Sequence, residues 1–121
     1  MLLLNIKNKN EIFMDFGYVY LICDPANDTY KIGVTRTLKS NRLKKLQTGN
    51  STELHIVTYY KTEWPFRLET MLHSHFKTKQ ELNEWFALSP YDVIHFKEIC
   101  NEMNDIIISL KDNIFFSKGL R

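Results

Sequence analysis

Alternating apolar positions near the start of the chain predict a β-hairpin. The stretch 18–23 is rich in aromatic and β-branched side chains, and the stretch 29–35 is similar, so we expect a strand at each. Residues 24–28 between them include proline, asparagine and two aspartates, which favour a tight turn. Gly33 lies inside the second stretch, where glycine indicates a bulge or the close approach of another group.

Apolar side chains at helical spacing predict three helices after the hairpin. The first covers residues 38–48, and the second covers about residues 65–77. The third begins at Pro90, because Ser89 and Asp92 have the spacing of a capping box. We expect this third segment to be a single helix.

Two further strands, at 53–62 and 84–88, complete the order β-β-α-β-α-β-α. This order predicts the α/β class, with a small mixed β-sheet that starts from an N-terminal hairpin and is flanked by helices. A chain of 121 residues is long enough for one domain. We expect an N-terminal arm or edge strand at 1–16, the domain at 17–96, and a C-terminal helix and tail at 97–121 that pack on the domain or on a partner.

Basic residues are concentrated in one part of the chain, although the net charge is only +2. Six lysines and arginines, and no acidic residue, lie between Thr29 and Thr52. Such a cluster attracts phosphates, although a solvated helix face would have the same composition. The candidate nucleic-acid contacts among them are Arg36, Lys39, Lys44 and Lys45.

The two cysteines and the short apolar runs indicate a cytoplasmic protein. Cys23 and Cys100 lack metal-type spacing, so we expect buried thiols in a reducing compartment. No apolar run is long enough to cross a membrane. The opening residues 1–4 are too short for a signal peptide and lack a basic region before them.

Five short strings occur in a fixed order along the chain. They are Val19-Tyr20, Tyr30-Lys31-Ile32-Gly33, Arg42-Leu43 with Leu46-Gln47, Leu68-Glu69 with His73, and Glu84-Trp85-Phe86. Together they resemble the GIY-YIG nuclease superfamily, in particular its T5orf172 or MUG113 branch of phage and viral domains. The resemblance covers about residues 17–96. It implies a divalent-metal-dependent endonuclease that hydrolyses phosphodiester bonds in DNA, with RNA as an alternative substrate.

The resemblance assigns catalytic roles to Tyr20, Lys31, Arg42 and Glu69. Tyr20 would activate the attacking water, and an ammonium on the paired strand, that of Lys31, would stabilise its phenolate. The guanidinium of Arg42 would bind the phosphoryl group as it gains charge. Each of these residues taken singly is typical of a core tyrosine or a surface charge, so the assignment depends on their order.

The resemblance also implies a metal site and several supporting residues. Glu69 would hold Mg²⁺ or Mn²⁺, which keep much of their hydration shell. His73 lies one turn after Glu69, where it would support the carboxylate or contact a phosphate; two ligands are too few for structural zinc. Tyr18 and Tyr30 are further supporting residues in the two hairpin strands.

The chain departs from the superfamily pattern at three places. Tyr18 stands where the first signature glycine is expected. The second signature tyrosine falls on Lys31, while Tyr30 lies one position earlier, on the other face of the strand. The late asparagine has two candidates, Asn83 and Glu84.

Two other functions remain as alternatives on the same scaffold. One is a nucleic-acid-binding module without catalysis, because no additional DNA-binding domain is visible in the sequence. The other is a subunit that works through a partner. The apolar stretches 106–108 and 114–116 exceed what one helix face buries, so we expect this tail to pack on another protein or on another copy of the chain, as a homodimer through the C-terminal helix. The Lys-, Asn- and Ile-rich composition suits a bacterial or phage source.

Overall fold

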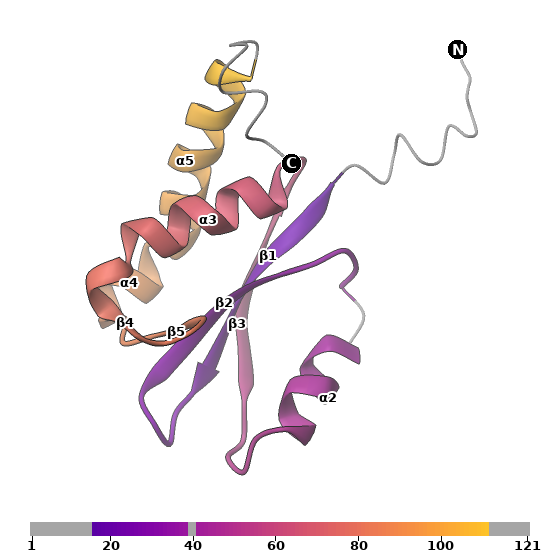
Figure 1. Cartoon of the computed structure of the whole chain (residues 1–121), viewed down its shortest axis with the longest axis vertical. Helices are drawn as coiled ribbons and strands as arrows, with labels where there is room; N and C mark the ends of the chain where they lie inside the picture. Colours follow the sequence, from indigo (N-terminus) through magenta and orange to yellow (C-terminus); the bar gives the residue numbers. More distant parts are fainter. Residues whose placement is uncertain (1–15, 39–40, 112–121) are drawn as a thin grey trace, which may run out of the picture.

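A computed structural model describes residues 16–38 and 41–111, without the side chains of Asn41 and Arg42. Five strands form one sheet in the order β3-β1-β2-β5-β4 (Figure 1). The strands are β1 (Gly17–Asp24), β2 (Thr29–Thr35), β3 (His55–Thr62), β4 (Gln80–Leu82) and β5 (Trp85–Phe86). The helices are α2 (Asn41–Thr48), α3 (Pro65–His75), α4 (Pro90–Ile94) and α5 (Phe96–Leu110), with a 3₁₀ turn, η1 (Lys77–Lys79). The expected N-terminal arm and the stretch 114–116 lie outside the described residues.

The predicted α/β class and the N-terminal hairpin are confirmed. The sheet differs from the mixed sheet that we expected, because the pairs β1–β2, β1–β3, β2–β5 and β4–β5 are all antiparallel. Strands β2 and β3 do run in the same direction and are joined through α2. However, β1 lies between them and is antiparallel to both.

Two local features differ from the prediction for the second half of the chain. The single helix expected after Pro90 is two helices, because His95 leaves helical geometry with φ −96° and ψ 8°. Strand β4 was not predicted, because its three residues are all polar or exposed. Asn83, with φ 54°, makes the turn that folds β4 back on β5.

One face of the sheet carries the main core. Helices α3 and α5 pack on this face, and α2 lies on the opposite side of the strands (Figure 1). Cys100 of α5 is fully buried here, and burial raises the pKa of its thiol to about 12. Cys23 is only half-buried, and both cysteines are free thiols. The buried members of this core are Val19, Leu21, Ile32, Leu68, Leu72, Phe76, Phe86, Leu88, Phe96, Cys100 and Ile107.

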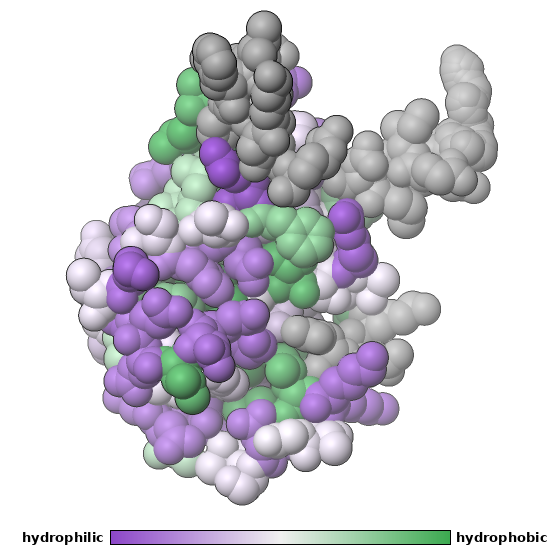
Figure 2. All heavy atoms as spheres, viewed as in Figure 1, coloured by the Kyte–Doolittle hydropathy of each residue, from purple (hydrophilic) through white to green (hydrophobic). Residues whose placement is uncertain are grey.

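The other face of the sheet carries a smaller cluster beneath α2. Tyr20, Ile22 and Leu54 are buried there, and the helix adds Leu43 and Leu46. Figure 2 shows a mostly hydrophilic surface in which apolar side chains are visible where α2 meets the sheet. Because this cluster is small, α2 holds its place through few apolar contacts.

The start of α4 has the predicted capping box, and Lys79 adds an ion pair to it. The Ser89 side chain accepts a hydrogen bond from the Asp92 amide, and the Asp92 carboxylate accepts one from the Ser89 amide at 2.9 Å. Burial disfavours the charged carboxylate, but Lys79 and Ser89 outweigh this effect and hold the pKa of Asp92 below its ordinary value.

We expect Asp92→Asn to reduce the dependence of stability on acid pH. A carboxylate with a lowered folded-state pKa stabilises the fold above its unfolded pKa, about 3.9, and this contribution is lost as pH falls through the folded value. At pH 6 the substitution should cost about 1 kcal/mol. Urea unfolding at pH 6 and pH 3 should show a smaller difference between the two pH values in Asp92→Asn than in the wild type. The exposed Asp105→Asn is the control, and equal pH dependence of wild type and Asp92→Asn would contradict the assignment.

The C-terminal helix packs on the domain. Phe96 and Ile107 of α5 are fully buried in the main core, whereas Ile106 and Ile108 are about half exposed. The homodimer expected through this helix stays a prediction. No helix in the described part of the chain is long and apolar enough to span a membrane.

Candidate active site

The side chain of Tyr20 lies across Gly33 of the neighbouring strand. The register of β1 and β2 places these two residues opposite each other. Tyr20 is 1% exposed, and a Cβ atom built on Gly33 would overlap its hydroxyl and lie 3.0 Å from Cε1. The close approach expected at Gly33 is therefore confirmed, and the approaching group is the Tyr20 phenol.

Lys31 lies on the same face of β2 as the Tyr20 ring. It pairs with Ile22, two positions along β1 from Tyr20, so it is a diagonal neighbour of Tyr20. Its ammonium group forms an ion pair with Glu84, which precedes β5. The lysine side chain is 9% exposed and the glutamate 41%. Of the two candidates for the late polar position, Glu84 thus faces Lys31, and Asn83 serves the turn.

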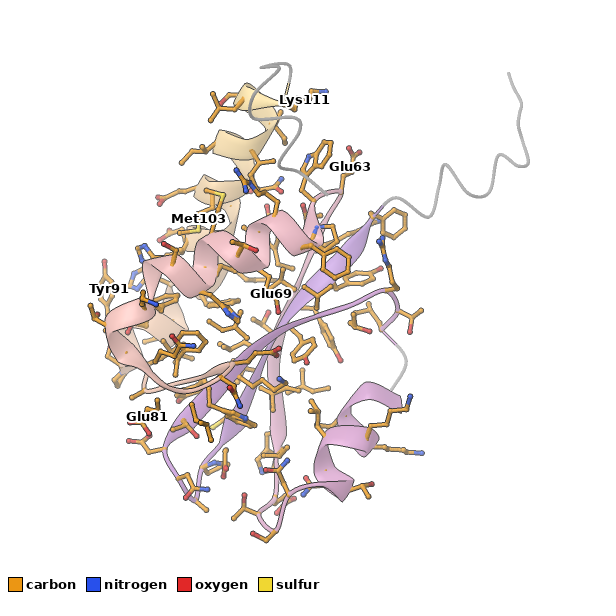
Figure 3. The ribbon with its side chains drawn as sticks, viewed as in Figure 1. Glu63, Glu69, Glu81, Tyr91, Met103 and Lys111 are labelled. Atoms are coloured by element: carbon orange, nitrogen blue, oxygen red, sulfur yellow. The ribbon has the colours of Figure 1, made fainter. Side chains whose placement is uncertain are left out.

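His73 and Glu69 of α3 lie along the edge of β2. The Ile32 amide donates to the Glu84 carbonyl at 3.1 Å, and Nε2 of His73 lies 3.0 Å from the Ile32 carbonyl oxygen. Because a carbonyl only accepts, Nε2 carries a proton and donates it. The same nitrogen lies 3.9 Å from Glu69 Oε2. Figure 3 shows Glu69 on α3 beside the crossing strands β1 and β2.

These contacts gather four of the predicted site residues around positions 31–33 of β2. Tyr20 lies over Gly33, Lys31 begins this stretch, and His73 binds the carbonyl between them. Glu69 adjoins His73 and is 21% exposed, so its carboxylate remains accessible to solvent. Tyr20 and Lys31 reach this segment from the face of the sheet that carries α2. His73 and Glu69 reach it from α3, which packs on the other face.

Two of the predicted supporting residues lie away from this segment. Tyr30 is on the opposite face of β2, beside Cys23, and burial raises the pKa of its hydroxyl. Tyr18 is opposite Thr35 at the far end of the hairpin, where its ring contacts the edge of Tyr59. The side chain of Tyr30 therefore faces the main core, and that of Tyr18 lies beside Tyr59 at the other end of the hairpin.

The model of the T5orf172 domain matches residues 17–103. The chain belongs to the T5orf172 family. This family is associated with nucleases. The matched region includes all the site residues described above and extends into α5. No curated protein and no solved structure matched the chain.

The basic residues of the T5orf172 domain are only partly described. Lys44 and Lys45 are exposed on α2, on the face of the sheet that carries Tyr20. Arg36 is exposed beyond β2, with its guanidinium 5.3 Å from the centre of the Phe66 ring. Lys39 and the side chain of Arg42 lie outside the described residues, although the backbone of Arg42 is in α2.

The donor groups of the T5orf172 domain suit a hydrated hard cation. Within residues 16–38 and 41–111, no three His, Cys, Asp or Glu side chains form a group that could enclose a metal. The Nε2 atom of His73 donates to Ile32, so it is not available as a ligand. The carboxylate of Glu69 would suit Mg²⁺ or Mn²⁺, which retain several waters and need few protein oxygens.

Two contacts in the site were not anticipated from the sequence. The hydrogen bond from His73 to Ile32 depends on where α3 docks, and no sequence pattern indicates it. The ring of His73 also packs edge-on against Phe86, at 4.9 Å between centroids. Phe86 is fully buried in the main core.

Proposed function

We propose that this T5orf172 domain is a divalent-metal-dependent endonuclease of the GIY-YIG type that hydrolyses phosphodiester bonds in DNA. The main support is the phenol of Tyr20, which lies over Gly33 on the strand segment that Lys31, His73 and Glu69 also border. A phenol, an ammonium and a carboxylate near one strand segment can supply a base, a positive charge and a metal ligand for hydrolysis of a phosphodiester.

In this proposal Tyr20 is the general base. The phenolate oxygen accepts the proton of the attacking water, and a nearby ammonium favours the phenolate form. Lys31 provides that ammonium from the same face of the sheet. Its ion pair with Glu84 fixes the long side chain in place, and an ammonium has three donors, so others remain for the substrate.

Helix α2 provides the positive charge in this proposal. It packs through Leu43 and Leu46 on the face that carries Tyr20, and its backbone includes Arg42. The guanidinium of Arg42 would bind the phosphoryl oxygens as they gain charge. Lys44 and Lys45 are exposed on the same helix and would contact neighbouring phosphates.

Glu69 would hold the divalent cation in this proposal. A cation bound there supplies positive charge that stabilises the departing oxygen. His73 donates to the Ile32 carbonyl and lies 3.9 Å from Glu69, so it links α3 to β2 and keeps the carboxylate beside the strand. His73 is thus a positioning residue for Glu69.

The proposed function is tested by cleavage of supercoiled plasmid in Mg²⁺ or Mn²⁺. The protein should convert it to nicked and linear forms, and EDTA should stop the reaction. Glu69→Gln should slow cleavage by about 10²–10³-fold, because it removes the charge that holds the cation. Glu63→Gln is the matched control, since Glu63 is an exposed carboxylate just before α3 (Figure 3). Equal cleavage by the wild type and Glu69→Gln would refute the nuclease assignment and indicate a contaminant.

One observation favours a second candidate, a DNA-binding module without catalysis. The ammonium of Lys31 is already paired with Glu84, which neutralises part of the charge that a phenolate needs. A module of this kind would bind DNA with a steep salt dependence and would be indifferent to EDTA. The plasmid assay separates the two candidates, because the module gives binding without nicks.

A further inference from the structure

A surface hollow of about 620 Å³ lies at the edge of the sheet, away from positions 31–33. It is bordered by the outer strand β3, by the start of β1 and by α5. Three tyrosines and two lysines line it, together with one glutamate. The lining residues are Tyr18, Leu38, Tyr59, Tyr60, Lys61, Lys97, Glu98 and Asn101.

The hollow lies beside Tyr20, the one described residue of the proposed active site that its lining residues neighbour. Tyr59 pairs with Tyr20 across β1 and β3, and Tyr18 lies two residues before Tyr20 on the same face. A strand with its phosphate near Tyr20 would therefore bring its next nucleotides to Tyr18 and Tyr59.

The rings in the hollow are held by their neighbours. Tyr18 and Tyr59 pack edge to face, with centroids 6.3 Å apart and planes at 78°. The hydroxyl of Tyr60 donates to Asn101 Oδ1 at 3.0 Å, which ties its ring to α5. Tyr18 and Tyr59 are half-buried on one face of the sheet, so each keeps some exposed surface. Tyr60 lies on the other face of β3, against the main core, and borders the hollow from that side. Fixed, partly exposed rings lose little entropy when a base stacks on them.

The charges around the hollow suit a phosphate backbone. Lys61 and Lys97 are exposed and outnumber the single carboxylate of Glu98. Lysines beside aromatic rings are the combination that binds single-stranded nucleic acid, since the rings stack on bases while the ammonium groups follow the phosphates. The bases of an intact duplex are stacked on one another and cannot offer their faces to these rings.

We propose that this hollow binds unpaired nucleotides, so that the substrate is DNA with a single-stranded segment next to the cleavage point. The cleavage part of this inference rests on the proposed nuclease function, whereas the binding part does not. A continuous duplex would engage the basic helix α2 without filling the hollow. A bound peptide is the competing occupant, and it would leave the protein without a preference for single strands.

The inference is tested by fluorescence anisotropy in EDTA, which prevents cleavage. The probes are a labelled oligothymidylate of about 12 nucleotides and a blunt duplex of the same length. The wild type should bind the single strand more tightly than the duplex. Tyr59→Leu should weaken single-strand binding by about tenfold and change duplex binding less than about twofold, while Tyr59→Phe, which keeps the ring, should bind like the wild type.

Tyr59 also packs against the cluster beneath α2, so Tyr59→Leu could weaken binding by disturbing the fold. A second variant, at an exposed residue, avoids this problem. Lys97→Ala changes an exposed residue of the hollow and should lower the salt dependence of single-strand binding by about one unit of slope. Equal affinity for the two probes, or equal binding by Tyr59→Leu and Tyr59→Phe, would overturn the inference. Single-strand preference without cleavage in Mg²⁺ would retain the inference and refute the nuclease. Cleavage of the duplex without a preference for single strands would support the nuclease and refute the inference.

Discussion

Replacing Tyr20 by phenylalanine should slow DNA cleavage by about 10²–10⁴-fold and leave the protein folded. The substitution removes one oxygen, the atom that is proposed to take the proton of the attacking water. The ring itself remains, and it still packs with Ile22 and Leu54 in the cluster beneath α2. Single-turnover cleavage in Mg²⁺ gives the rate, and thermal unfolding shows whether the fold persists.

The matched control is Tyr91→Phe. Tyr91 is 67% exposed on α4 and stacks on His95, so the loss of its hydroxyl should change neither rate nor stability. If Tyr20→Phe cleaves as fast as Tyr91→Phe, Tyr20 is not the general base. If Tyr20→Phe is slow only because it unfolds, its melting temperature will fall together with its rate.

Gly33→Ala should destabilise the protein by about 1–3 kcal/mol and also reduce cleavage. The added methyl group would occupy the position of the Tyr20 hydroxyl and ring, and part of the overlap is with ring carbons, so a small rotation of the hydroxyl cannot relieve it. The ring must leave its place over β2. Urea unfolding measures the loss of stability. Gly49→Ala is the control, because its Cβ would meet only ordinary contact, 3.8 Å from the Leu46 carbonyl oxygen.

A double-mutant cycle tests whether the loss of stability in Gly33→Ala comes from the overlap with the Tyr20 ring. In a Tyr20→Ala background the methyl group of Gly33→Ala has room, so its cost should fall well below the cost in the wild type. Additive effects would show that Gly33 is required for another reason, such as backbone geometry.

The sequence predicted the hairpin closely, because its signal is local. Strand β2 has the predicted bounds, since alternation and the turn at 24–28 define both of its ends. The capping box at Ser89 is equally local and is confirmed. Strand β4 could not be predicted in this way, because its polar residues are ordered by pairing with β5 rather than by burial. The helix break at His95 was also hidden, since apolar residues continue at helical spacing on both sides.

The candidate site was predicted in part. Sequence order placed Tyr20 and Lys31 on one face of the hairpin, and the register confirms this. The sequence did not show that Gly33 is opposite Tyr20, or that Lys31 pairs with Glu84, a residue 53 positions away. Contacts of this kind depend on how elements that are distant in the sequence pack together, and the local pattern of a single sequence does not show that packing.

The short strand β5 has a consequence for solubility. It pairs with two of the seven residues of β2, so the rest of that side of β2 is not paired with β5. Unpaired backbone groups of this kind can pair with a strand of another chain. Helix α3 lies along β2, and its His73 binds the Ile32 carbonyl there. The helix that carries Glu69 therefore also covers this side of β2 and hinders the addition of a strand from another chain.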